Sequence, residues 1–236
     1  MVKPVIISDF DNTITQKDVN ETICFYYGDQ KTEQIEEKFS RGEIGCYQSL
    51  SFHYSRLKIS EKEFEEFVKK NIEIDTYFKH FYDKIKKERI KFAIVSGGFI
   101  NYIKILFEKY DIKMKHLVYA NKLHFKDNNI EVDFLHEINE DECHQDFGIC
   151  GNCKYKIINQ YKVEIADRKS KKGNQQSQLI YIGDGLTDRC VAEEVDILLA
   201  KKGGSLEKYC QSKNLNYYSY KNFRDVEKMI DRYFIN

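Results

Sequence analysis

Short apolar runs that alternate with helix-like segments constrain the fold of this chain more than any other feature. The clearest runs are residues 5–8, 91–96 and 179–182, and each is mainly apolar. Runs of this kind fit strands that are buried on both faces of a parallel sheet. Strands that alternate with helices predict such a sheet with helices on both sides. We therefore expect an α/β fold with a Rossmann-like parallel sheet.

The segment after the first run has a different pattern. From about residue 19 to residue 87, apolar residues recur at helical spacing with charged residues between them, and the first part of this segment shows no strand pattern. An all-helical insert after the first strand predicts a small cap. We expect a core domain of residues 1–15 and 80–236 and a helical cap domain of residues 16–79.

The rest of the chain continues the alternation of strands and helices. Gly97 and Gly98 predict a turn between a strand and a helix, and residues 167–178 (DRKSKKGNQQSQ) are almost wholly polar, which predicts a loop. The other predicted elements are a hairpin of residues 117–125 and 130–134, a strand at 197–199, and helices at 99–110, at 152–165, from about 205 and from about 222.

Reactive side chains follow three of the predicted strands. They are Asp9 and Asp11 after the first, Ser96, Gly97 and Gly98 after the second, and Asp184 and Asp188 after the third. In an open parallel sheet, ligands bind beyond the carboxyl ends of the strands, so these residues should meet in one crevice. Carboxylates gathered there would repel one another unless a cation neutralised them, and an all-oxygen site suits Mg²⁺. Each motif alone is also common in ordinary turns, and it is their joint occurrence in this order that indicates a site.

At this point the chain resembles a known family. DFDNT (9–13), VSGG (95–98), a lysine near position 154 and IGDGLTD (182–188) are similar, in order and spacing, to the four motifs of the haloacid dehalogenase superfamily of phosphotransferases. The resemblance implies that Asp9 attacks phosphorus to give an aspartyl-phosphate, and that Asp11 protonates the leaving oxygen and later activates water. It also implies that Mg²⁺ is held by Asp9, Asp11 (through its carbonyl), Asp184 and Asp188, and phosphate by Asn12, Thr13, Ser96, Gly97 and Lys154.

The physical requirements of this chemistry agree with the resemblance. A carboxylate attacks a phosphate only if the repulsion between the two anions is screened, and the transferring group needs fixed hydrogen-bond donors. Lys154 and Lys156 both lie near the expected place for the lysine. We favour Lys154 because it starts a predicted helix, whose N-terminus also attracts anions; a solvated surface lysine is the alternative. We expect Asp188 to hold a metal-bound water or to orient this lysine.

The position of the helical insert, between the first two motifs, resembles the subclass that contains phosphoserine phosphatase. By this resemblance we expect Asp18, His53 and Arg56 to recognise the substrate. Two departures count against phosphoserine itself, because Asp18 replaces a glutamate and His53 stands where that enzyme has an arginine that grips the substrate carboxylate. Arg56, one helical turn later, could substitute for that arginine.

CGNCK (150–154) and the Thr-Asp of IGDGLTD resemble another member of this subclass, the 2-hydroxy-3-keto-5-methylthiopentenyl-1-phosphate phosphatase of methionine salvage. We therefore expect a Mg²⁺-dependent phosphomonoesterase for a small phosphorylated metabolite, with this ester as one candidate. Phosphatases for phosphoserine or phosphocholine are alternatives, and so are a phosphomutase and a non-catalytic module that binds phosphorylated ligands or zinc.

Seven cysteines, an odd number, are scattered along the chain and do not resemble a disulfide framework, which favours reduced thiols. Cys150 and Cys153 nevertheless have the spacing of a zinc-binding pair, and Cys143 with its neighbour His144 could supply further ligands. Structural zinc is thus an alternative to ordinary thiols, and a redox pair is another.

The charges of the chain balance, with 38 Lys and Arg against 38 Asp and Glu, so the chain as a whole has no strong field to attract nucleic acid or an anionic membrane. The sequence also shows no signal-peptide pattern and no apolar stretch of membrane-spanning length. We expect a cytoplasmic protein, a monomer or a homodimer, that binds a small metabolite and neither nucleic acid nor membrane.

Overall fold

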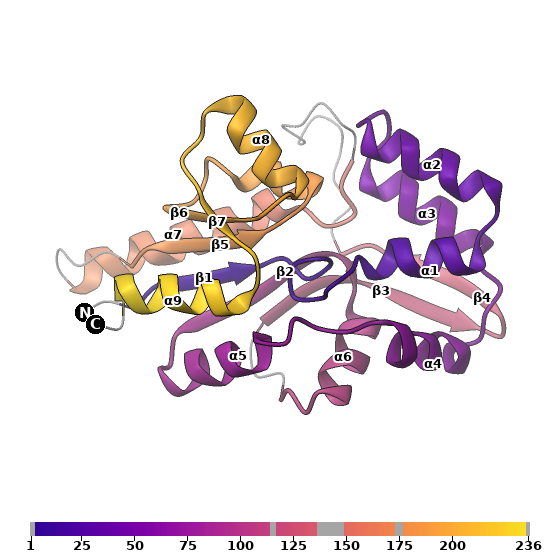
Figure 1. Ribbon diagram of the computed structural model, residues 1–236, viewed down its shortest axis with the longest axis horizontal. Coiled ribbons are helices and arrows are strands. Elements are labelled where there is room, and N and C mark those ends of the chain that lie inside the picture. The colour runs from indigo at the N-terminus through magenta and orange to yellow at the C-terminus, as the bar shows by residue number, and fades with distance from the viewer. Residues whose placement is uncertain (1–2, 114–116, 136–148, 173–176, 235–236) are drawn as a thin grey trace.

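A computed structural model describes residues 3–113, 117–135, 149–172 and 177–234 (Figure 1). Its centre is a seven-stranded sheet in the order β4-β3-β2-β1-β5-β6-β7. Neighbouring strands run parallel except β3 and β4, which form the predicted hairpin. The strands are β1 (Val5–Ser8), β2 (Lys91–Phe99), β3 (Leu117–Lys126), β4 (Asn129–Asp133), β5 (Leu179–Gly183), β6 (Ile197–Lys201) and β7 (Tyr218–Tyr220). The predicted α/β fold with a mainly parallel sheet is confirmed.

Helices cover both faces of the sheet because side chains alternate along each strand. In β1, Ile6 belongs to the apolar cluster on one face, and Val5 and Ile7 belong to the cluster on the other. The first face packs against α5 (Phe78–Lys87), α6 (Ile100–Lys109) and α9 (Phe223–Phe234), and the second against α7 (Lys154–Lys172) and α8 (Ser205–Lys213) (Figure 1). The strand ends that carry the motifs are therefore anchored in a core that is apolar on both sides.

Helices also fill the segment between β1 and α5, as predicted. They are α1 (Val19–Tyr27), α2 (Gln30–Ser40), α3 (Cys46–Arg56) and α4 (Glu61–Asn71). The first three pack against one another, α3 also contacts β4, and α4 lies beside α6 (Figure 1). The division of the chain into a core of residues 1–15 and 80–236 and a cap of residues 16–79 stays a prediction.

The expected turn at Gly97 and Gly98 is wrong, because β2 continues through both glycines to Phe99 and α6 begins directly at Ile100. The pairing of β2 with β3 shifts register between Val95 and Phe99. What Gly98 supplies is space, since a Cβ built there would lie 1.4 Å from the Tyr102 hydroxyl and 2.6 Å from Asp11 Oδ2. The two glycines therefore do not form a turn, and Gly98 instead allows strand β2 and helix α6 to approach each other closely.

The predicted loop at residues 167–178 is also wrong in part, because α7 continues to Lys172. This stretch contains residues that favour helix and has no Gly or Pro before Gly173, so its polarity alone does not end the helix. Strand β7 has only three residues and was not predicted. Within the described ranges, none of the helices is long and apolar enough to cross a bilayer.

Candidate active site

A cavity of about 300 Å³ lies at the carboxyl edge of the sheet, between the ends of β1, β2 and β5 and the helices α1 to α3. Its core side includes Asp9, Asp11, Gly97 and Asp184, and its helical side includes Asp18, Glu21 and Glu36. The three motifs that follow predicted strands therefore meet in one place, at the edge where the sequence places a ligand site.

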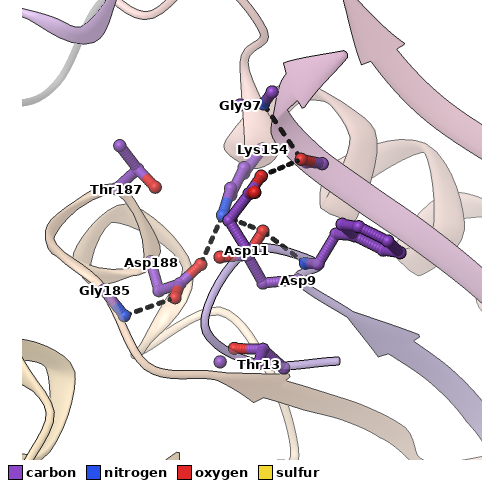
Figure 2. A network of polar contacts seen from close by, with 12 residues as sticks. Asp9, Asp11, Thr13, Gly97, Lys154, Gly185, Thr187 and Asp188 are labelled. Carbon is purple, nitrogen blue, oxygen red and sulfur yellow. Dashed lines mark hydrogen bonds and ion pairs between the residues drawn. The ribbon is translucent and has the colours of Figure 1, made fainter. Parts of the chain in front are cut away.

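Lys154 joins the carboxylates of two motifs (Figure 2). Its Nζ lies 2.9 Å from Asp9 Oδ1 and 2.6 Å from Asp188 Oδ1, and 2% of its side chain is exposed. It is the first residue of α7. Burial alone lowers the pKa of Lys154, but Asp188 and Asp9 outweigh burial and raise this pKa above its ordinary value. The buried ammonium therefore stays charged beside the two carboxylates.

Asp188 is fully buried and its two oxygens accept four hydrogen bonds. Oδ1 accepts from Lys154 Nζ at 2.6 Å and from the Tyr181 hydroxyl at 2.5 Å. Oδ2 accepts from the backbone N–H groups of Asp184 and Gly185, each at 2.9 Å, and Figure 2 shows the hydrogen bond from Gly185. A carboxylate has about four lone-pair directions, so these donors saturate Asp188. Its geometry fits the expectation that it orients the lysine better than the expectation that it binds metal.

The carboxylates of Asp9, Asp184 and Asp188 form a buried group in which one oxygen of each lies within 4.8 Å of the others. Burial raises the pKa of Asp9 well above its ordinary value, against the opposing effect of Lys154, and Asp188 and Asp184 raise it further. Burial and Asp188 likewise raise the pKa of Asp184 to about 6. The single ammonium of Lys154 does not balance the negative charge of the three carboxylates. An all-oxygen site of this kind fits a divalent cation such as Mg²⁺.

Asn12 and Thr13, which were expected to bind phosphate, direct their side chains to Asp184. Asn12 Nδ2 lies 2.7 Å from Asp184 Oδ2, and Thr13 Oγ1 lies 2.9 Å from Asp184 Oδ1. Asn12 has φ of 50°, a left-handed conformation that Asn tolerates, and Lys201 donates to its backbone carbonyl. The turn after β1 therefore holds the carboxylate that follows β5.

Asp11 lies two residues from Asp9, but its carboxylate has different partners. Oδ1 accepts from the backbone N–H of Val19 at 3.1 Å, and Oδ2 accepts from Ser96 Oγ at 3.1 Å and from the Tyr102 hydroxyl at 2.5 Å. Burial raises the pKa of Asp11, although these three hydrogen bonds oppose the rise. The carboxylates of Asp9 and Asp11 thus have different hydrogen-bond partners.

The backbone around Ser96 and Gly97 is held by two buried asparagines. Asn152 Nδ2 donates to the Ser96 carbonyl at 2.8 Å, and Asn121 Nδ2 donates to the Gly97 carbonyl at 2.7 Å. The Ser96 hydroxyl accepts from the Gly98 N–H at 2.9 Å. Gly97 lines the cavity, so its backbone is fixed where a phosphoryl group could lie.

Of the residues expected to recognise substrate, Asp18 lies in the cavity. It is the N-cap of α1, where its side chain accepts from the Glu21 N–H at 2.9 Å, and burial and the nearby Asp11 raise its pKa well above the ordinary value. His53 Nε2 instead lies 2.7 Å from Glu36 Oε1, and Arg56 pairs with Asp29. Neither His53 nor Arg56 is among the described residues that line the cavity.

The alternative of a structural zinc site is not supported. Cys143 and His144 lie outside the described residues, and Cys150 and Cys153 are half-buried in the turn that leads into α7. Among the described residues, the cluster that could hold a metal ion is the carboxylate group at Asp9.

Sequence reasoning missed several side chains that build the site, chiefly Tyr102, Asn20 and Tyr181. Tyr102 and Tyr181 are fully buried and donate to Asp11 and Asp188 respectively, while Asn20 lines the cavity. A tyrosine among apolar residues is usually a core residue, so no sequence pattern singles out these two. Asn20 lies two positions after Asp18, which was expected to recognise the substrate, and this closeness in the sequence is the signal that could have identified Asn20.

Comparison with known proteins places the chain among phosphatases. A family model described as "Putative Phosphatase" matches residues 4–231. The chain is 29% identical to polyol phosphate phosphatase PYP1 of Saccharomyces cerevisiae, over 96% of this chain and 92% of the relative. It is also 29% identical to Pdp3-interacting factor 1 of Schizosaccharomyces pombe (98% and 96% covered) and 27% identical to the 2-hydroxy-3-keto-5-methylthiopentenyl-1-phosphate phosphatase of Bacillus pumilus (98% and 93% covered).

Solved structures show the same fold. A phosphoserine phosphatase that carries a phospho-aspartyl intermediate analogue matches with a TM-score of 0.67 at 19% identity, over 97% of this chain and 99% of that one. A substrate-bound phosphoserine phosphatase matches with the same TM-score, identity and coverage. At this identity the likeness concerns the architecture, which is the one that the sequence motifs predict.

Proposed function

The chain belongs to the Putative Phosphatase family, with the fold of the haloacid dehalogenase phosphatases, and we propose that it is a Mg²⁺-dependent phosphomonoesterase that works through an aspartyl-phosphate. The observation that carries this proposal is the geometry around Lys154. One buried ammonium contacts both Asp9 and Asp188, Asp184 lies beside them, and Asp11 is held apart by other donors. This arrangement separates a nucleophile from a proton carrier.

Asp9 is the nucleophile in this proposal. Its Oδ1 accepts from the Phe10 N–H at 2.7 Å and from Lys154 at 2.9 Å, so two donors fix the carboxylate. Attack on phosphorus would then fall to Oδ2. Lys154 is already placed to neutralise an oxygen of the phosphoryl group, and the Gly97 N–H supplies a further donor. Ser96, which was also expected to bind phosphate, directs its one hydroxyl hydrogen to Asp11 Oδ2.

Asp11 carries the proton. Burial raises the pKa of Asp11, which favours the protonated form that protonation of the leaving oxygen requires. The leaving oxygen takes this proton as its bond to phosphorus breaks. The resulting carboxylate then removes a proton from the water that attacks phosphorus of the aspartyl-phosphate, which restores both side chains.

Asp9, Asp184 and the backbone carbonyl of Asp11 would hold the Mg²⁺. The ion would neutralise the carboxylates and polarise the phosphoryl oxygens. Asp188 is left out of this set because four protein donors already saturate its oxygens. Asn12 and Thr13 act on the metal site through Asp184, which they hold in place.

The cavity suggests which leaving groups fit. Asp18, Glu21 and Glu36 line its helical side, and Arg189, which also lines the cavity, lies on the core side in the same short helix as Thr187. A leaving group that faces the helices therefore meets carboxylates, which accept hydrogen bonds from hydroxyl or ammonium groups and repel another carboxylate. We propose a small substrate without a carboxylate, such as a polyol phosphate, phosphocholine or the methylthiopentenyl ester. Phosphoserine fits less well because Arg56 is engaged by Asp29.

Phosphate release from purified protein tests the proposal. With Mg²⁺ present, we expect hydrolysis of p-nitrophenyl phosphate and of at least one of the three substrates without a carboxylate, with a higher kcat/KM than for phosphoserine. Asp9→Asn should abolish release while the melting curve stays cooperative. Normal turnover by this variant would refute the assignment of the nucleophile, and preference for phosphoserine would refute the reasoning about the leaving group. Transfer of the phosphoryl group to a second hydroxyl, with no release into water, would indicate a phosphomutase.

A further inference from the structure

A chain of hydrogen bonds runs from the helical segment to Asp11. The Tyr54 hydroxyl on α3 lies 2.8 Å from Asn20 Oδ1, and Asn20 Nδ2 on α1 lies 3.1 Å from the Tyr102 hydroxyl. The Tyr102 hydroxyl on α6 lies 2.5 Å from Asp11 Oδ2. Both tyrosine side chains are fully buried. Four residues from four separate segments thus form one polar path, in which Asn20 and Asp11 line the cavity and the two tyrosines are buried.

The hydrogen bonds of this path all run from donor to acceptor in the direction of Asp11. The Tyr54 hydroxyl donates to Asn20 Oδ1, which leaves the Asn20 amide nitrogen to face Tyr102. An amide nitrogen only donates, so the Tyr102 oxygen accepts from it and must direct its single hydrogen to Asp11. Hydrogen bonds that follow one another in this way strengthen each other in a buried site. The amide orientation of Asn20 therefore determines that Tyr102 donates to Asp11.

The surroundings of Tyr102 are shaped for this contact. A Cβ at Gly98 would lie 1.4 Å from the Tyr102 hydroxyl, so this oxygen reaches Asp11 only because residue 98 is a glycine. The Tyr102 ring packs against Phe10 and Phe99, with centroids 5.9 and 6.1 Å away, which fixes the ring.

We propose that Tyr102 is a positioning residue for the proton carrier Asp11, and that Asn20 and Tyr54 couple this positioning to the seating of α1 and α3 over the cavity. The inference rests on the proposed function, in which Asp11 protonates the leaving oxygen. Tyr102 keeps its own proton throughout. It holds Asp11 Oδ2 together with Ser96, so that the carboxyl group presents its proton to the leaving oxygen and does not rotate away.

The consequence depends on the leaving group. An alkoxide is a poor leaving group and needs its proton as the bond to phosphorus breaks, whereas p-nitrophenolate leaves without one. Displacing Asp11 should therefore slow the attack on alkyl esters and spare the attack on p-nitrophenyl phosphate. kcat/KM reports this first chemical step, because it covers events only up to the formation of the aspartyl-phosphate. A general loss of folded enzyme would instead lower both values equally.

Tyr102→Phe tests the proposal, because it removes the hydroxyl and keeps the ring. We expect kcat/KM for glycerol phosphate, or for the best alkyl phosphate of the substrate panel, to fall about tenfold or more relative to kcat/KM for p-nitrophenyl phosphate. Tyr82→Phe is the matched control. Tyr82 is equally buried, but its hydroxyl donates to the Lys113 carbonyl. This control should leave the ratio unchanged.

Asn20→Asp is a second test, which does not depend on how Tyr102→Phe folds. A carboxylate at residue 20 only accepts, so the Tyr102 hydroxyl would turn towards it and away from Asp11. We expect the ratio to fall as in Tyr102→Phe. An unchanged ratio in both variants would overturn the inference.

Asp11→Asn separates this inference from the proposed function. If Asp11→Asn lowers the ratio strongly and Tyr102→Phe does not, Asp11 is the proton carrier but Tyr102 does not position it. If Asp11→Asn leaves the ratio unchanged, the role of Asp11 in the proposed function is refuted, and the inference about Tyr102 is refuted with it.

Discussion

Asp188→Asn should destabilise the protein strongly, although it changes one oxygen to one nitrogen. Asp188 is fully buried and accepts from Lys154, Tyr181 and two backbone N–H groups. An asparagine accepts on one side only, so its NH₂ group must face either Lys154 and Tyr181 or the two backbone donors. In each orientation two donors lose the oxygen of residue 188 that they now contact.

The magnitude follows from two opposing effects. Removing one partner of a buried ion pair costs about 3–5 kcal/mol, and here Lys154 keeps Asp9 as its remaining carboxylate. The loss is partly offset because Asp188 raises the pKa of both Asp9 and Asp184, so its removal also relieves repulsion. We expect a net loss of about 2–4 kcal/mol in the free energy of unfolding, or roughly 4–16 °C in Tm for a chain of this size.

Urea denaturation followed by circular dichroism measures this loss, with EDTA present so that metal binding does not contribute. Asp133→Asn is the control, because Asp133 is an exposed partner of His124 at 3.5 Å and its removal should cost less than about 1 kcal/mol. A loss in Asp188→Asn no larger than that of the control would refute the reasoning that Asp188 is the buried anchor of Lys154.

Two further predictions concern the metal and the substrate. The raised pKa of Asp184, about 6 in the folded protein against 3.8, means that the metal-free folded state holds a proton that the unfolded chain has lost. As the pH rises from about 4 to about 6, the unfolded chain releases this proton while the folded protein still holds it. The free energy of unfolding of the metal-free protein should therefore fall by up to about 3 kcal/mol over this range. Mg²⁺ should accordingly raise Tm more at pH 7 than at pH 5, and equal shifts in thermal melting would contradict this. For the substrate, Asp18→Asn should raise KM for the preferred alkyl phosphate about tenfold, and Arg56→Ala should change it less than about twofold. Steady-state kinetics that show the reverse order would place recognition at Arg56.

The parts of the site that were predictable are those encoded in short contiguous motifs. Asp9, Asp184 and Ser96 follow apolar strands, and because parallel strands end at one edge, the sequence predicts that these residues meet there. Lys154 was identifiable because the start of a helix has a defined position relative to a strand end. Each of these predictions depended on the order of strands and helices along the chain and required no knowledge of where the side chains point.

The parts that were not predictable depend on how helices are rotated and packed. His53 and Arg56 lie on α3 at the expected place in the chain, but their side chains contact Glu36 and Asp29. Tyr102 and Tyr82 are both buried tyrosines on amphipathic helices, and only the three-dimensional arrangement shows which of them reaches Asp11. A sequence pattern gives the buried face of a helix but not the polar atom that a buried tyrosine contacts.

The most direct measurement of the central claim is the covalent intermediate on Asp9. In Asp11→Asn, p-nitrophenyl phosphate should still phosphorylate the enzyme, because its leaving group needs no proton, while hydrolysis of the aspartyl-phosphate slows for lack of a base. After acid quenching and proteolysis, mass spectrometry should find one added phosphoryl group on the peptide that contains Asp9, and hydroxylamine should remove it. A phosphoryl group on another residue, or hydrolysis by the wild-type protein with no phosphorylated peptide in either form, would contradict the account.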